Sequence, residues 1–270
     1  MKTTLITPTF NSAKTIADTL DSVIAQTLTL NNTPAPQDLE YLIIDGASTD
    51  GTLGIVREYQ EKYPALNIKF ISEPDNGIFD AMNKGVKMAT GDIVGILNSD
   101  DFFYSADVLS KVISKFEENP EIDAVYGDLL YVDNDDVKKQ TRFWRAGDYK
   151  EENLNWGWSI PHPTFFVRRV VYKKLIDKNS KIFDTSFDIA ADYELTFRLL
   201  KIEKIKVKYI KDILVTMRNG GTSASSLKQR IKGWTEQRRV WRINSIKIPR
   251  FFITRRLLHK MGQFLRMGQK

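Results

Sequence analysis

Two adjacent carboxylates stand directly after an apolar run of the sequence. Residues 92–97 read DIVGIL, and Asn98, Ser99, Asp100 and Asp101 follow them. A helix cap needs only one acid, and neighbouring like charges repel, so folding alone does not account for the pair. Carboxylate oxygens are the ligands that hard divalent cations prefer. The pair therefore predicts a metal site.

The apolar run belongs to a regular alternation of elements along the first half of the chain. Hydrophobic periodicity predicts strands at 3–6, 41–45, 68–72 and 92–97, and helices at 12–27, 52–63, 78–89 and about 106–119. Such alternation indicates an α/β fold with a mostly parallel sheet flanked by helices. Beyond residue 123 the predicted elements are shorter and richer in strand: 124–132, 138–144, a helix at 189–201, then 205–210 and 213–218.

Polar residues follow each of the four predicted strands, at the edge where open parallel sheets bind their ligands. They are Thr7, Pro8, Thr9 and Asn11 after the first strand, Asp45 with Ser48 and Asp50 after the second, Asp75 after the third, and Asn98 to Asp101 after the fourth. Several also have purely structural interpretations. Asp50 suits a helix cap, and Asp75-Asn76-Gly77 suits a turn. The gathered carboxylates nevertheless favour Mg²⁺ or Mn²⁺ at this edge.

Composition excludes several other kinds of chemistry. The 270 residues contain no cysteine and two histidines, His162 and His259, which argues against thiolate or multi-histidine metal sites. Neither a glycine-rich dinucleotide fingerprint nor a P-loop is present. The N-terminus does not resemble a signal peptide, and no apolar run is long enough for a membrane span, so the expected location is the cytoplasm.

The charge is divided unevenly along the chain. The net charge is +6, but residues 228–270 hold 13 Lys and Arg against one acid, Glu236. This segment is expected to be helical with an interruption at Pro249, and its last part is amphipathic. Two interpretations are open: a helix docked on the body with a solvated basic face, or a helix lying on an anionic membrane surface.

Five motifs occur in an order that resembles the family 2 glycosyltransferases: TPTFN (7–11), IIDGASTDGT (43–52), EPDNGIFDAMNKG (73–85), LNSDD (97–101) and IAADYEL (189–195). The resemblance covers about residues 1–220. It implies the GT-A fold and an inverting transfer from a nucleotide sugar, most often a UDP-sugar, with Mg²⁺ or Mn²⁺. We expect a transferase domain at 1–222, with a donor half to about 103 and an acceptor half from 104, then a basic tail at 223–270.

The resemblance also implies roles for single residues. Asp100 would ligate the metal, with Asp101 in support, and Asp192 would be the catalytic base. A carboxylate in that role takes the proton from the attacking acceptor hydroxyl. Asp188, four residues earlier, is a competing candidate. The donor-binding residues would be Thr7, Pro8, Thr9, Asn11, Asp45, Asp75, Asn83 and Asn98, the last standing where the family commonly has an acid.

The acceptor side is expected between the metal motif and the base. Trp156 and Trp158 could stack on a sugar ring, although core packing is an equal alternative for one of them, and His162 could bind acceptor or diphosphate. NGGTS (219–223) has the glycine content of a lid. The acceptor is expected to be a glycan or lipid-linked hydroxyl in surface polysaccharide synthesis. The tail would hold the protein at the inner face of the cell membrane.

Other functions compete with this interpretation. A nucleotidyltransferase that makes nucleotide sugars also needs an acidic metal site, but TPTFN is not the glycine- and basic-rich loop expected of one. A non-catalytic sugar-binding protein would lack turnover. A nucleic-acid-binding module would use the basic tail and show steep salt dependence, but it leaves Asp45, Asp100 and Asp192 unexplained, and we expect no nucleic-acid partner.

Overall fold

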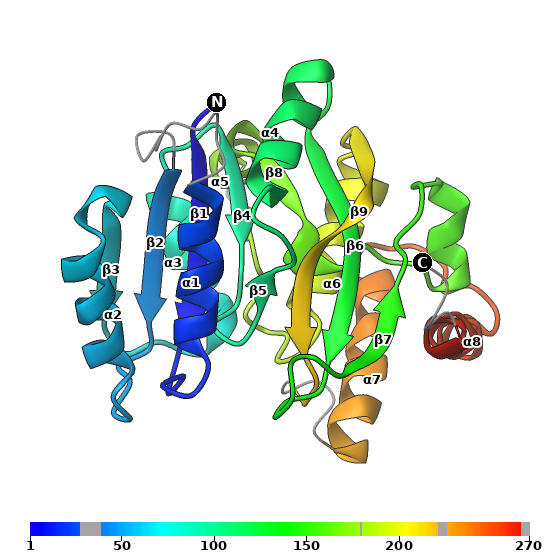
Figure 1. Ribbon diagram of the computed structural model, residues 1–270. Helices are drawn as coiled ribbons and strands as arrows, with labels where there is room; N and C mark the ends of the chain where they lie inside the picture. The colour runs from blue at the N-terminus through cyan, green and yellow to red at the C-terminus, as the bar shows by residue number, and fades with distance from the viewer. Residues whose placement is uncertain (28–38, 179, 221–225, 266–270) are drawn as a thin grey trace.

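The structure is a computed structural model that describes residues 1–27, 39–178, 180–220 and 226–265. Nine strands form one sheet in these residues (Figure 1). The strands are β1 (Thr3–Thr9), β2 (Leu39–Asp45), β3 (Ile68–Ser72), β4 (Ile93–Ile96), β5 (Phe102–Phe103), β6 (Ala124–Val132), β7 (Gln140–Trp144), β8 (Phe166–Arg168) and β9 (Val207–Arg218). Residues 28–38 and residues 221–223 of the expected lid (219–223) lie outside the described residues.

The sheet order is β3-β2-β1-β4-β8-β6-β9-β5, and β7 pairs with the C-terminal part of β6, residues 129–132. Strands β1 to β4 pair in parallel, β6 is parallel to β9, and β8 is antiparallel to both β4 and β6. Six strands consequently run in one direction, with β5, β7 and β8 reversed. Their carboxyl ends share one edge, the lower edge in Figure 1. The expected mostly parallel α/β sheet is confirmed.

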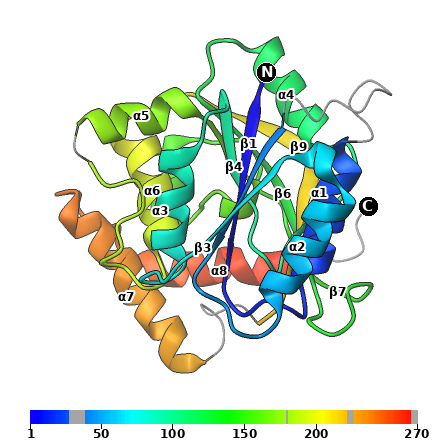
Figure 2. The ribbon, with the colours of Figure 1, turned by 90° about the vertical axis from the view of Figure 1, so that its left-hand side faces the viewer.

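Helices cover both faces of the sheet. They are α1 (Ile16–Thr27), α2 (Thr52–Lys62), α3 (Ile78–Met88), α4 (Val108–Glu118), α5 (Arg169–Asp177), α6 (Ala191–Phe197), α7 (Leu227–Ile243) and α8 (Phe252–Leu265). One hydrophobic cluster joins α1, α2 and α4 to the sheet, and a second joins α3, α5, α6 and α7. Figure 2 shows α1 and α2 on one face and α3, α5 and α6 on the other.

Two parts of the second half differ from the sequence-based expectation. The segments 205–210 and 213–218, expected as two strands, form the single strand β9. Its register against β6 shifts at Asp128, so a β-bulge accommodates the polar residues 211–212 between the two segments. The helix expected at 189–201 begins at Ala191 and changes to a π turn at Arg198–Ile202. Strand β8 and helix α5 were not expected, because their apolar residues are few and directly adjacent.

The basic C-terminal segment is part of the packed core. Trp241 of α7 and Phe252 at the start of α8 are 1% and 2% exposed and belong to the cluster that contains α6. The Trp241 ring lies 4.7 Å from that of Phe197, and its indole N–H donates to the Tyr193 hydroxyl. The inner faces of both helices therefore dock on the body. Within the described residues, no helix combines the length and apolarity that crossing a bilayer requires.

Candidate active site

The turn that carries the paired carboxylates is fixed by its main chain. Each of its four carbonyl oxygens accepts a hydrogen bond: that of Asn98 from the Asp101 N–H, and the next three, in chain order, from the side chains of Thr15, Arg218 and Thr19. Thr15 lies just before α1, Thr19 lies within it, and Arg218 ends β9. These bonds hold the backbone from outside, which leaves the carboxylates of the turn free to face a ligand.

The two carboxylates lie in an environment that disfavours their charge. Burial raises the pKa of Asp100, opposed by the charge of Arg218. Burial and the neighbouring Asp100 raise the pKa of Asp101 well above its ordinary value, against the Asn98 amide and Arg218. Asp101 is fully buried, and its Oδ1 and the Asn98 Oδ1 have no hydrogen-bond partner within the described residues. A bound cation would supply the missing positive charge.

These residues fit a divalent cation that is shared with a ligand. No group of three or more His, Cys, Asp or Glu residues gathers at one point of the described chain, so a site built from protein ligands alone is not seen there. Mg²⁺ is usually held by one or two carboxylates, with phosphate oxygens and waters completing its coordination. Asp100 and Asp101, with the unpartnered oxygens beside them, match that smaller donor set.

The Asp45 and Asp75 carboxylates, near the carboxyl ends of β2 and β3, differ in their partners and in their exposure. The Asp45 carboxylate is fully buried and accepts from the Ser48 N–H and hydroxyl and from the Ser72 hydroxyl, so its oxygens already have protein partners. The Asp75 carboxylate lies over Gly46, where a Cβ would come within 2.7 Å of its Oδ2. Glycine at position 46 thus makes room for Asp75, which is partly exposed.

The residues at the end of β1 and just after it contact the neighbouring strand and its loop. The Thr7 hydroxyl bonds to that of Tyr41, while the buried Thr9 Oγ1 has no partner within the described residues. Asn11 has a left-handed backbone (φ 48°); its N–H donates to the Ser48 hydroxyl, and its side chain accepts from the Thr49 N–H. Pro8 lies within β1 beside these residues. Asn11 therefore ties the first two strand ends together.

Asn83 links the two halves of the molecule. Its amide donates to the carbonyl of Phe183 and accepts from the Phe183 N–H, at 2.9 Å in each direction. Both functional atoms of the side chain are therefore used within the protein. Asn83 therefore connects α3 to the segment that leads to α6.

Asp192 lies in the first turn of α6 and is partly exposed. Its Oδ1 accepts the N–H of Tyr193 at 2.7 Å. The segment before it is held by Glu236 of α7, whose carboxylate accepts the N–H groups of residues 188–190 at 2.9–3.1 Å. The competing carboxylate, Asp188, is 64% exposed and forms an ion pair with Lys232. Of the two, Asp192 is the carboxylate that faces the interior.

The three expected acceptor-side residues differ in how far they are buried. His162 is nearly buried; burial lowers its pKa, and the charge of Asp192 acts in the opposite direction. Trp158 is 4% exposed and donates its indole N–H to the Ala146 carbonyl, so it belongs to the core and offers no ring face to a sugar. Trp156 is 57% exposed, with the Arg255 guanidinium 4.1 Å from its ring.

Comparison with known proteins shows to which family the chain belongs. A family model described as "Glycosyl transferase family 2" matches residues 4–176, well over half of the chain. The chain is a member of glycosyl transferase family 2. Its matched region contains Asp100, Asp101 and the ends of β1 to β3, whereas α6, β9 and both C-terminal helices lie beyond it.

Curated relatives of this family 2 glycosyltransferase act in glycan synthesis. The chain is 28% identical over 225 residues to a "PGL/p-HBAD biosynthesis glycosyltransferase" of Mycobacterium bovis, covering 83% of this chain and 79% of that protein. It is 25% identical to the "Poly(ribitol-phosphate) beta-glucosyltransferase" of Bacillus spizizenii, covering 83% of this chain but 34% of that one.

Solved structures show the same GT-A fold. The chain aligns with S. aureus TarS 1-349 in complex with UDP at a TM-score of 0.63 and 20% identity, covering 94% of this chain and 68% of that one. It aligns with the mannosyltransferase PcManGT of Pyrobaculum calidifontis, in complex with GDP-Man and Mn²⁺, at 0.64 and 21%, covering 99% and 70%. Against a longer TarS structure, the chain spans 44% of the protein.

Four further residues lie close to the expected site residues and were not expected. Burial raises the pKa of the Tyr131 hydroxyl on β6. The charges of Asp101 and Asp192 also raise this pKa, and those of Arg142 and Arg256 lower it. The Arg142 guanidinium lies 3.5 Å from the Tyr131 ring, and Arg218 and Arg256 reach in from β9 and α8. Arg218 contacts the turn of Asp100 and Asp101, and Arg256 contacts the residue after Asp192.

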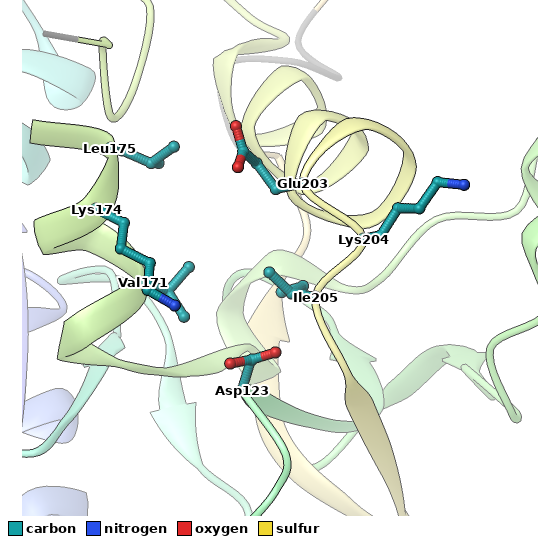
Figure 3. Close-up of a pocket in the computed structure, with 7 residues that line it drawn as sticks. All are labelled: Asp123, Val171, Lys174, Leu175, Glu203, Lys204 and Ile205. Atoms are coloured by element: carbon teal, nitrogen blue, oxygen red, sulfur yellow. The ribbon is translucent and has the colours of Figure 1, made fainter. Parts of the chain in front are cut away.

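A pocket on the family 2 glycosyltransferase lies apart from this site. It is lined by residues of α5 and by the segment that enters β9, with Asp123 at its base (Figure 3). Asp123 precedes β6, so this pocket is at the amino-terminal edge of the sheet, opposite the carboxyl ends. Its carboxylate already accepts the Lys206 N–H, and Glu203 forms an ion pair with Lys178.

Proposed function

We propose that this glycosyltransferase is an inverting, metal-dependent enzyme that moves a sugar from a nucleotide-diphosphate donor, with a UDP-sugar expected, to an acceptor hydroxyl. The acceptor would be a glycan or a lipid-linked sugar in surface polysaccharide biosynthesis. One observation carries the proposal: Asp101 is fully buried beside Asp100, and its Oδ1 has no hydrogen-bond partner within the described residues. A carboxylate pair of this kind suits a divalent cation that is shared with a diphosphate.

The donor side would be built from the strand ends of the first half. Asp100 and Asp101 would hold Mg²⁺ or Mn²⁺, which when bound stabilises the negative charge of the leaving diphosphate. Asn98 would contact the ribose, since an amide can both donate to and accept from a hydroxyl. Thr7, Pro8 and Thr9 would flank the nucleobase. Of the two nearby acids, Asp75 is the one with an oxygen left for a base N–H.

The acceptor side would be built around Asp192. As general base, it would accept the proton from the acceptor hydroxyl while that oxygen attacks the anomeric carbon from the face opposite the diphosphate. One carboxylate oxygen is held by the Tyr193 N–H, which leaves the other for the substrate. Glu236 fixes the preceding backbone and so the direction of this side chain. Nearly buried His162 would line the acceptor side.

The donor nucleotide is the main open choice, and the comparisons guide the screen. TarS is described in complex with UDP and with UDP-GlcNAc, and PcManGT with GDP-Man and Mn²⁺. We therefore expect a UDP-sugar to raise the melting temperature in the presence of Mn²⁺ and to be hydrolysed slowly without acceptor. GDP-mannose is the comparison donor.

The test is a screen of nucleotide sugars with Mn²⁺, following released nucleotide and thermal stabilisation for wild type and Asp100→Ala. We expect one nucleotide class to stabilise the wild type, with the effect largely lost in the variant. The control is Asp80→Ala, because Asp80 lies on α3, outside the turn of Asp100 and Asp101, with its carboxylate 3.9 Å from the Lys84 ammonium. If no donor is hydrolysed or bound with any divalent metal, or if Asp100→Ala behaves as wild type, the proposed function is wrong.

The tail is proposed to place the enzyme at an anionic membrane surface, in the cytoplasm on the inner face. The outer side of α8 exposes Leu258 and Met261, each 62% exposed, close to the exposed Phe251 and several basic residues. Apolar side chains among lysines and arginines favour the interface of a charged bilayer. Because α7 and α8 belong to the core, deleting them would test folding instead.

Point substitutions on the outer face give a cleaner membrane test. Leu258→Glu with Met261→Glu is expected to abolish co-flotation with vesicles of anionic phospholipid and leave the melting temperature nearly unchanged. Ile176→Glu, an exposed apolar residue on α5, is the matched control. Equal flotation of wild type and the double variant would exclude the membrane role.

A further inference from the structure

Helix α8 contributes one side chain to the catalytic centre. The Arg256 guanidinium donates through Nη1 to the Gly157 carbonyl at 2.8 Å and to the Ser159 hydroxyl at 3.3 Å. It lies 5.1 Å from the ring of Tyr193, the residue after the proposed base. All of these contacts belong to the acceptor half, so the basic tail completes that half of the site.

The docking of α8 at this point depends on a glycine. Gly157 has φ +79°, and a Cβ there would lie 2.6 Å from the Arg256 Cβ and 2.7 Å from its Cα. The helix backbone therefore rests directly on residue 157, and no larger residue fits. This close approach sets where the Arg256 guanidinium can reach.

The charge of Arg256 has no direct counter-ion. Burial lowers the pKa of its guanidinium, while Tyr193, Asp192 and Tyr131 act in the opposite direction. An arginine nevertheless stays protonated. Among the described residues it has no ion pair within 4.0 Å, and its hydrogen bonds use Nη1 only. The guanidinium is partly exposed and keeps its remaining N–H donors, so it can bind an anion supplied by a ligand.

The position of Arg256 indicates which substrate supplies the anion. The diphosphate of a donor would sit at Asp100 and Asp101, whereas the contacts of Arg256 are with Gly157, Ser159 and Tyr193, the residue after Asp192. In an inverting displacement the leaving diphosphate departs on the face opposite the attacking hydroxyl. A cation beside the base consequently faces the acceptor.

We propose that the acceptor carries an anionic group, a phosphate or a carboxylate, that is bound by the free donors of Arg256 next to Asp192. Guanidinium binds both groups through paired hydrogen bonds. Arg255 and the exposed ring of Trp156 form an outer wall of the same surface, suited to the sugar that bears the anion. This proposal rests on the proposed function, because it names the class of acceptor for that reaction.

The test compares matched probes that differ only in charge. Glycerol phosphate against glycerol tests the phosphate, and methyl glucuronide against methyl glucoside tests the carboxylate; binding is followed by titration calorimetry without nucleotide or metal. We expect at least one anionic probe to bind wild type about tenfold or more tightly than its neutral partner. Arg256→Gln should abolish that preference, and Arg256→Lys should keep part of it. The arm that responds identifies phosphate or carboxylate.

Controls separate this result from general effects of charge and folding. Arg250→Gln removes one exposed charge just before the same helix and is expected to keep the preference. Circular dichroism checks the fold of each variant, and Arg256→Lys retains the long stem if Arg256→Gln is unstable. Wild type without a preference for either anion, or an undiminished preference in a folded Arg256 variant, overturns the proposal. Because no donor is present, failure here is distinct from failure of the donor screen.

Discussion

The guanidinium of Arg218 donates a hydrogen bond of 2.7 Å to the main-chain carbonyl oxygen of Asp100. The same group forms an ion pair with Asp18 of α1 and lies over the Phe102 ring. Arg218 and Asp100, more than a hundred positions apart in the chain, are thereby joined at the turn that carries the paired carboxylates. The orientation of the Asp100 carboxylate depends on the end of β9.

Arg218→Lys should weaken metal binding more than it weakens the fold. A lysine keeps the charge but cannot hold the Asp100 carbonyl and the Asp18 carboxylate in one planar fork. We expect Mn²⁺ to bind the UDP complex several-fold more weakly, as measured by titration calorimetry. Arg168→Lys is the matched control, because Arg168 also donates to carbonyls, those of Ile122 and Phe116, far from the site. Equal Mn²⁺ affinity in both variants and wild type would contradict the prediction.

Asp192→Asn should reduce turnover and leave donor binding intact. The amide keeps the size of the side chain but cannot take a proton, so we expect donor turnover to fall by about 10²–10⁴-fold. Nucleotide release measures the rate, and the thermal shift with UDP and Mn²⁺ measures binding. Asp188→Asn, which removes the partner of Lys232, is the control and should stay near wild type. The reverse pattern would make Asp188 the base.

Glu236→Gln should destabilise the segment before Asp192. The carboxylate accepts three main-chain N–H groups with its two oxygens, whereas an amide offers a single oxygen and a competing N–H donor. We expect a loss of about 1–3 kcal/mol in the free energy of unfolding, with a lower kcat and little change in donor KM. Urea denaturation and steady-state kinetics measure these. Glu203→Gln, at a surface ion pair, should cost far less.

Glu40 should make stability depend on pH in the acid range. Burial raises its pKa, but hydrogen bonds from Lys69, Thr4 and Thr90 outweigh this and lower the pKa to about 2. A lowered native pKa stabilises the fold above the ordinary value of 4.5, and this stability is lost as the pH falls toward 2.

Glu40→Gln measures this contribution. The variant should lose on the order of 2 kcal/mol at pH 7 and much less at pH 2 to 3, since the wild-type carboxylate is then becoming protonated. Denaturant unfolding across the pH range is the measurement. Glu58→Gln, on the exposed side of α2, should show no such pH-dependent difference. A constant gap between Glu40→Gln and wild type at every pH would refute the linkage.

The part of the candidate site at the ends of β1 to β4 could be located from the sequence. Each strand of a parallel sheet ends at the same edge, so the polar residues after β1 to β4 must meet. What the sequence did not reveal was how each side chain is used. Asp45 is taken up by Ser48 and Ser72, and Asn83 by the backbone of Phe183, because those partners are set by tertiary packing.

The acceptor half was less accessible from the sequence. Tyr131 lies on a strand whose register shifts, so simple alternation does not say which face it takes. Arg256 belongs to a basic amphipathic run that looks alike whether it packs on protein or on lipid. The close contact between Gly157 and Arg256 shows that this part of the run packs on protein. Of the two tryptophans, burial alone distinguishes Trp158 in the core from Trp156 at the surface.

The placement of Trp241 and Phe252 in the main core has a consequence for synthesis of the chain. As the protein leaves the ribosome, the apolar surface around Phe197 stays uncovered until both aromatic residues have emerged, because they fill it from the far end of the sequence. Uncovered apolar surface of this kind promotes aggregation and recruits chaperones. The half of the protein that contains Asp192 can therefore complete its core only after Phe252 has been synthesised.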